Sequence, residues 1–159
     1  ILGIRKIQQV NTKSFITITA EATRMSQTPS YLLRDAGNWY EHGLIREGYT
    51  NENQILGAGA GFGNNVQTVI IKYGRLVNNI GLFYQHIEQN PKRLVGDARD
   101  AWLGNIFWND YSYGLTAQYH YKKVYFKLNA QWVNSINYLW SSGNNQNNFH
   151  CFLNTSYVW

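Results

Sequence analysis

The last eleven residues of the chain are the sequence feature that most constrains its fold. Counted back from the terminal residue, every second side chain belongs to a mostly apolar set: Trp159, Tyr157, Thr155, Leu153, Cys151 and Phe149. The side chains between them are mostly polar: Val158, Ser156, Asn154, Phe152 and His150. Successive side chains of a β-strand point to opposite faces, so this alternation predicts a strand with one apolar and one polar face. A strand between lipid and a wet lumen needs that pattern, and an amphipathic strand of a soluble sandwich also has it.

The composition favours the membrane alternative. Aromatic residues make up 16% of the chain and charged residues only 14%, whereas a soluble domain has roughly 25% charged residues. The mean hydropathy is −0.41, and the sequence contains no run of about 18 apolar residues, which excludes a transmembrane helix. Many aromatic residues with a polar average are typical of a barrel wall that shows half its side chains to lipid and half to water.

The scattered basic residues and the single cysteine limit the classes of partner that we expect. The net charge is +5, but the basic residues are scattered, whereas a nucleic-acid reader clusters them on one face or helix. We therefore expect no nucleic-acid partner, and we expect basic residues in the lumen, in turns, or in loops that face acidic sugars or lipopolysaccharide. The single cysteine, Cys151, cannot form an internal disulfide and is expected to be an inert, lipid-facing thiol.

Alternation continues through the chain and predicts about seven strands. They cover residues 148–159, 124–136, 110–121, 80–88, 67–76 and 14–25, and the first residues to about 9. Short turns are expected near 11–13, 77–79 and 122–123, and long connections at 26–65, 89–109 and 137–147. If the C-terminus lies in the periplasm, all the long connections are extracellular, which is the rhythm of outer-membrane barrels.

Seven strands do not close a bacterial barrel, in which strand numbers are even and start at eight. Open sheet edges are not tolerated in a bilayer. The chain also begins with Ile1 in place of Met. We therefore predict an all-β fold, a transmembrane antiparallel β-barrel of the outer membrane, with residues 1–159 as the C-terminal portion of a single barrel domain. The remaining strands are expected upstream of Ile1 or from another chain.

A glycine-rich stretch carries a family resemblance. The segment Glu47-Gly48-Tyr49-Thr50, followed by Leu56-Gly57-Ala58-Gly59-Ala60-Gly61-Phe62-Gly63-Asn64-Asn65, resembles the Wzi capsule-assembly family of outer-membrane proteins. The chain departs from the usual family pattern at Ala60, Phe62 and Asn64. The same glycines do not fit a dinucleotide fingerprint, because the third glycine position falls on Phe62 or Asn64.

The resemblance implies a large barrel of about eighteen strands. It also implies a lectin-like protein without a cofactor, which attaches or organises capsular polysaccharide at the cell surface and is not an enzyme. The aromatic end, Trp159, is similar to the end of the last strand of outer-membrane barrels. There it is part of the signal that the barrel-insertion machinery reads.

Two groups of residues in the long connections have the chemistry of a glycan site. Aromatic rings stack on sugar C–H groups, and cations pair with acidic sugars. The first group comprises Lys92, Arg93, Arg99 and Trp102, and the second comprises Trp39, His42 and Arg46. Alternatively, Trp102 is an interfacial girdle residue, as we favour for Trp108, and the second group packs a loop folded into the lumen.

Other functions have less support in the sequence. The four histidines lack metal-ligand spacing, and no local motif supports a catalytic triad, so we expect no catalytic residue and no metal. The main alternative is a porin or specific channel for anionic solutes. Its polar wall would comprise Lys72, Gln85, Gln118, Lys127 and Gln131. A further alternative is a barrel component of a larger surface complex.

Overall fold

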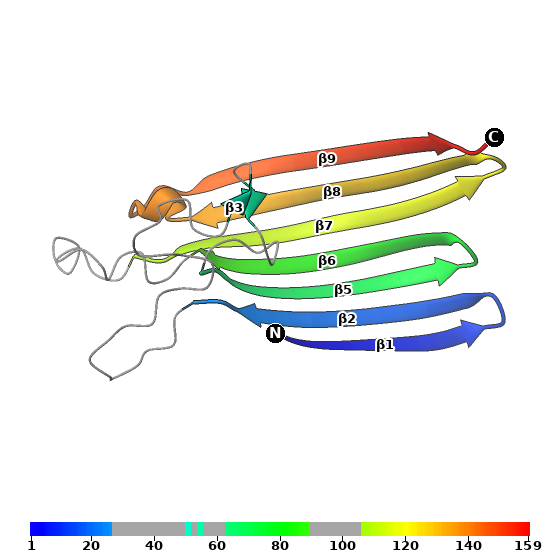
Figure 1. Cartoon of the computed structure of the whole chain (residues 1–159), viewed down its shortest axis with the longest axis horizontal. Coiled ribbons are helices and arrows are strands. Elements are labelled where there is room, and N and C mark those ends of the chain that lie inside the picture. Colours follow the sequence, from blue (N-terminus) through cyan, green and yellow to red (C-terminus); the bar gives the residue numbers. More distant parts are fainter. Residues whose placement is uncertain (27–49, 52–53, 56–62, 90–105) are drawn as a thin grey trace.

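The computed structural model describes residues 1–26, 50–51, 54–55, 63–89 and 106–159. Within these residues the chain forms one open sheet of seven antiparallel strands (Figure 1). In sheet order these are β1 (Leu2–Asn11), β2 (Ser14–Arg24), β5 (Asn65–Arg75), β6 (Asn78–Gln89), β7 (Trp108–Tyr121), β8 (Val124–Ile136) and β9 (Gln146–Tyr157). The strands β3 (Thr50–Asn51) and β4 (Gln54–Ile55) form a separate small sheet, and η2 (Tyr138–Trp140) is a 3₁₀ turn. The predicted strands are confirmed, with bounds that differ by at most two residues.

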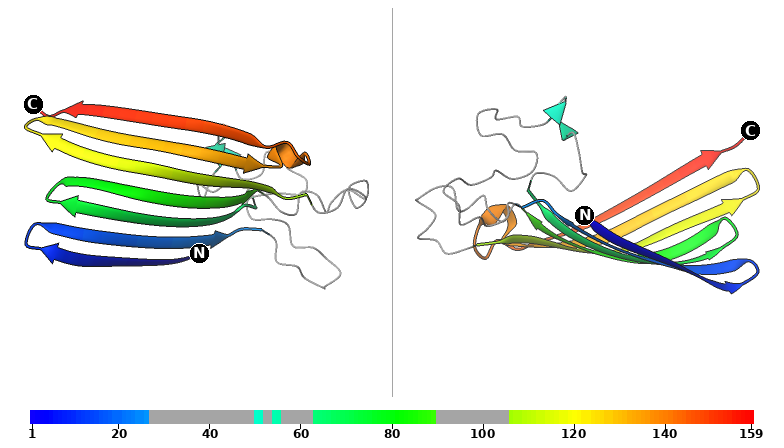
Figure 2. Two further views of the ribbon diagram at one scale, coloured as in Figure 1. Left: turned by 180° about the vertical axis from the view of Figure 1, so that it is seen from behind. Right: turned by 60° about the horizontal axis from the view of Figure 1, so that its bottom comes forward.

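The connections divide the sheet into two ends. The short turns β1–β2, β5–β6 and β7–β8 lie at one end, together with Trp159, and we call this the turn end (Figures 1 and 2). The strand ends that the longer connections join lie at the opposite end together with η2, and we call this the loop end. Left-handed backbone at Leu76 (φ 55°) and Lys122 (φ 54°) closes two of the turns. The expected separation of short and long connections is therefore confirmed. Among the described residues, no helix is long and apolar enough to cross a membrane.

The pairing register separates the side chains into two faces. Residues that pair directly across antiparallel strands lie on the same face, and alternate residues of a strand share it. The pairs Lys72–Gly81, Gly81–Thr116 and Thr116–Asn129 run across four strands in one row. Every residue predicted for the polar wall lies on this face: Lys72, Gln85, Gln118, Lys127 and Gln131. We call it the polar face.

The opposite face is mostly apolar between its two ends. One row of directly paired residues is apolar from β2 to β9, where it consists of Ile18, Ile71, Leu82, Leu115, Ala130 and Cys151, and it ends on β1 with Lys6. Large side chains here are well exposed, with Leu82 at 65% and Ile71 at 50%. We call it the apolar face.

Burial is inverted relative to a soluble domain. Among the described residues, the only buried hydrophobic side chain is Met25. Several small polar side chains of the polar face are buried instead, including Thr17, Ser112 and Ser135. The described residues therefore contain no hydrophobic core that would hold the sheet together in water.

Aromatic rings fill the spaces over two glycines of the polar face. Phe15 pairs with Gly74, and Phe83 pairs with Gly114. A Cβ atom added at either glycine would overlap the ring of its partner. Each glycine thus permits the close approach of a cross-strand ring, and each pair contributes to fixing the register of its two strands.

Candidate functional site at the loop end

A hydrogen-bonded network occupies the loop end of the polar face. Gln89 pairs directly with Trp108, and Asp110 lies two residues further along β7 on the same face. The Asp110 carboxylate is buried, and its residue is 8% exposed. It accepts hydrogen bonds from Trp108 Nε1 and Gln89 Nε2, both at 2.8 Å. Gln89 Oε1 in turn accepts one from Asn64 Nδ2 at 2.9 Å. The network ties the start of β5 to the end of β6 and the start of β7.

Three aromatic rings continue this network toward the loop-end connections. Trp108 contacts Tyr138 and Trp140 edge to face, with ring centroids 5.0 and 4.9 Å apart. Trp140 Nε1 also donates to the backbone oxygen of Gln89 at 3.2 Å. We call Asn64, Gln89, Trp108, Asp110, Tyr138 and Trp140 together the rim cluster.

Left-handed backbone shapes the segment that supplies two of these rings. Asn137, Leu139 and Trp140 have φ of 53°, 55° and 54°, a conformation that costs non-glycine residues on the order of 1 kcal/mol each. Asn137 offsets part of this cost with its side chain, which accepts from Gly143 N and donates to Phe107 O. The edge-to-face packing on Trp108 holds the other end of the turn.

A second set of polar contacts lies on the apolar face, at its loop end. Asn65 Nδ2 donates to Glu88 Oε2 at 2.7 Å, and Asn65 Oδ1 accepts from the backbone of Met25 and Ser26 at 3.2 Å each. His86 stacks on Tyr111 at 4.7 Å and contacts Asn109 Oδ1 at 2.8 Å. The apolar face therefore ends in polar side chains where the long connections begin.

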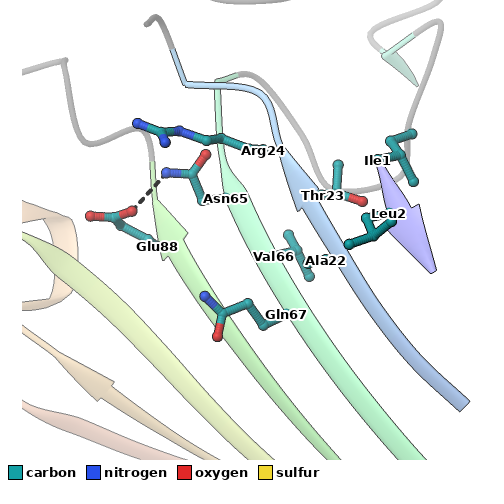
Figure 3. A pocket seen from close by; sticks show the side chains of 9 residues that line it. All are labelled: Ile1, Leu2, Ala22, Thr23, Arg24, Asn65, Val66, Gln67 and Glu88. Carbon is teal, nitrogen blue, oxygen red and sulfur yellow. Dashed lines mark hydrogen bonds between the residues drawn. The ribbon is translucent and has the colours of Figure 1, made fainter. Parts of the chain in front are cut away.

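A depression of about 530 Å³ lies beside this set, at the open edge of the sheet (Figure 3). Its lining comes from the loop end of β1, β2, β5 and β6: Ile1, Leu2, Ala22, Thr23, Arg24, Asn65, Val66, Gln67 and Glu88. These residues belong to both faces of the sheet, because the depression wraps the edge where β1 begins. We interpret it as the unfilled edge of the sheet and not as a ligand cavity.

The rim cluster combines a buried carboxylate with oriented polar groups and partly exposed rings. The Asp110 carboxylate already accepts two hydrogen bonds, so it orients the Trp108 ring and the Gln89 amide. The Trp108, Tyr138 and Trp140 residues are partly exposed. Within the described residues, no group of three or more His, Cys, Asp or Glu side chains could hold a metal ion. Partly exposed rings beside oriented amides are the groups that sugar recognition uses.

The residues predicted for a glycan site all lie outside the described residues. They are Trp39, His42 and Arg46 in the 27–49 segment, and Lys92, Arg93, Arg99 and Trp102 in the 90–105 segment. The second segment lies between Gln89 and Trp108 in the sequence, so rim-cluster residues flank it on both sides.

The sequence-based expectation for Trp108 in the rim cluster is wrong, and the sequence predicts no role for Tyr138 and Trp140. The girdle position favoured for Trp108 is wrong, because its pairing with Gln89 and its bond to Asp110 put it on the polar face. Tyr138 and Trp140 lie in a long connection for which the sequence predicts no binding role. The available signal is two aromatic residues shortly after Asn137, beside an otherwise polar stretch.

Comparison of the chain with protein-family models, curated proteins and solved structures finds no match. Function is therefore inferred from the two faces of the sheet, from the rim cluster, and from the resemblance carried by residues 47–65.

Proposed function

We propose that this chain forms part of the wall of an outer-membrane β-barrel, which attaches or organises an acidic polysaccharide at the cell surface and catalyses no reaction. The observation that carries the membrane part is the exposed apolar face. Burying one Leu or Ile side chain stabilises by about 1.5–3 kcal/mol, so a continuous apolar face in water would favour association or aggregation. An outer-membrane barrel wall has lipid on one face and a wet lumen on the other, which suits the apolar face and the polar face respectively.

Aromatic side chains border the apolar face toward both ends. Toward the loop end, one row of directly paired residues contains Phe149, Trp132, Tyr113 and Tyr84. Toward the turn end lie Tyr157, Tyr121, Tyr119 and Phe126. Phe149 and Tyr157 lie on the same strand, β9, with a separation of about 27 Å at roughly 3.4 Å per residue. A strand tilt of about 40° reduces this to about 20 Å, close to the roughly 25 Å apolar band of outer-membrane barrels.

The polysaccharide part rests on the loop end and on the family resemblance. The rim cluster provides partly exposed rings beside oriented amides, and the neighbouring segments carry the cations and aromatic residues that suit acidic sugars. A multivalent glycan needs only weak single-site affinity, because many sites act together. We also propose that the barrel-insertion machinery reads Trp159 at the turn end, and that basic residues outside the lipid band contact lipopolysaccharide.

The test compares cell-retained with shed capsule in a strain that lacks the protein. We expect the deletion to shed capsule, wild type to restore retention, and the combined Arg93→Ala, Arg99→Ala and Trp102→Ala variant to restore it only partly. Charge-mediated retention should also weaken with salt, whereas stacking should not. Unchanged retention in the deletion strain contradicts the capsule proposal. Full rescue by the triple variant removes those three residues from it.

A channel for anionic solutes is the second candidate, favoured by the cations of the polar face. Arg5, Lys72 and Lys127 all lie on it by register. Loss of anionic-solute uptake with normal capsule retention in the deletion strain would favour this function over polysaccharide binding.

A further inference from the structure

Both edges of the sheet lack a strand partner within the described residues. β1 pairs only with β2, and β9 pairs only with β8. Along each edge strand, about half of the backbone N–H and C=O groups point away from the sheet. Each such group costs several kcal/mol if it remains unsatisfied in hydrocarbon. In a bilayer, therefore, both edges need protein partners.

The two edges run in the same direction. β1 starts at the loop end, where Leu2 pairs with Ala22, and reaches the turn end at Asn11. β9 also starts at the loop end, where Gln146 pairs with Ser135, and finishes at the turn end, where Tyr157 pairs with Val124. This follows from an odd number of antiparallel strands (Figure 1). Direct closure of β1 onto β9 would therefore create a parallel seam.

We propose that an odd number of further antiparallel strands, of different sequence from this chain, completes the sheet. The two outermost of these strands both run from the turn end to the loop end, and each alternates apolar and polar side chains to continue the two faces. This inference rests on the barrel of the proposed function and not on its polysaccharide.

A second copy of the chain does not fit the edges. In copies that share one orientation in the membrane, β9 of one copy would meet β1 of the next in parallel, at every seam. Antiparallel pairing of β9 with β9, or of β1 with β1, requires one copy to be inverted, with its turn end at the loop end of the other. Lys6 on the apolar face of β1 further disfavours pairing of that edge with itself.

Two tandem variants of the full chain test the inference in vesicles. One joins two copies with a designed amphipathic strand before each copy, so that every neighbour is antiparallel. The matched control joins the same copies directly through a flexible linker long enough to cross the bilayer. On unheated gels we expect the first variant to run as a compact, heat-modifiable band, which is the sign of a folded barrel. We expect the control to show no such band.

A cross-linking measurement on the unfused chain adds a second readout. Cys151 on β9 and an Ile4→Cys substitution on β1 lie on the apolar face, two residues apart by the rows of paired residues, so a seam between copies with a register shift of two residues would place them side by side. We expect no oxidised dimer beyond that of the chain with Cys151 alone. Any of three results overturns the inference. These are a compact band from the directly joined copies, equal behaviour of the two tandem variants, and a disulfide dimer that forms only with Ile4→Cys. Failure of both tandems to float with vesicles overturns the barrel proposal as well.

Discussion

Phe152 and Leu153 are neighbours on β9 and offer a matched test of the membrane assignment. They are similarly exposed, at 60% and 64%. Phe152 pairs with Asn129 on the polar face, whereas Leu153 pairs with Leu128 on the apolar face. If water covers both faces, an arginine at either position is solvated equally well. If lipid covers the apolar face, only Leu153→Arg places a guanidinium in hydrocarbon.

The expected difference is large. Leu153 lies midway between Phe149 and Tyr157 on β9, near the centre of the proposed apolar band. An arginine on the lipid face costs about 2–4 kcal/mol at the midplane, a factor of about 30 to 900 in the membrane-folded population. Phe152→Arg lies on the polar face, the side of the proposed lumen, and should stay within about 0.5 kcal/mol, as surface substitutions usually do.

The assay is flotation with lipid vesicles over a series of urea concentrations, on the tandem variant whose edges the designed strands complete, with the substitution in one of its two copies. With an m-value of about 2 kcal/mol per molar, Leu153→Arg should lower the urea midpoint by about 1–2 M. Phe152→Arg should leave it nearly unchanged. Equal midpoints for the two variants would refute the assignment of lipid to the apolar face.

Three further predictions concern the end of the chain, the glycine pairs and the rim cluster. Trp159→Ala should reduce recovery of the chain in the outer-membrane fraction, measured by cell fractionation, because the proposed insertion signal loses its terminal ring. Full recovery would remove Trp159 from that signal. Gly114→Ala should destabilise by about 1–3 kcal/mol, because the added methyl overlaps Phe83; a double-mutant cycle with Phe83→Leu should recover part of the loss. Asp110→Ala should cost about 1–3 kcal/mol, because Trp108 Nε1 loses its buried acceptor; an unchanged urea midpoint and unchanged tryptophan fluorescence would contradict this.

The strands and their faces can be predicted because their signal is local. β7 alternates from Ser112 to Tyr121 with a period of two, and this period fixes both the strand and the side to which each residue points. The register then follows from matching faces and short turns, since a slip by one residue would exchange the two faces. For this reason the sequence alone correctly assigns Lys72 and Lys127 to the same face.

The rim cluster cannot be predicted in the same way, because its contacts are not local. Trp140 Nε1 bonds to the backbone of Gln89, 51 residues away in the chain. The left-handed backbone at Leu139 and Trp140 is held by packing on Trp108 and by the bonds of Asn137, and no propensity of leucine or tryptophan favours it. Trp108 itself is ambiguous in the sequence, since a ring at a strand start suits either face until the register is known.

The two faces of the sheet are stabilised by different physics, and this difference bears on function. The polar face is held from within, by contacts such as the ring of Phe83 over Gly114. The apolar face has ring contacts such as Trp132–Phe149, but its large side chains lie exposed, and Met25 is the only hydrophobic side chain that the described residues bury. In the proposed barrel its stabilisation comes from the hydrocarbon of the bilayer, which needs no specific contact. In hydrocarbon the unpaired edges of β1 and β9 would be costly, so the proposal of lipid on the apolar face also requires the proposed partner strands.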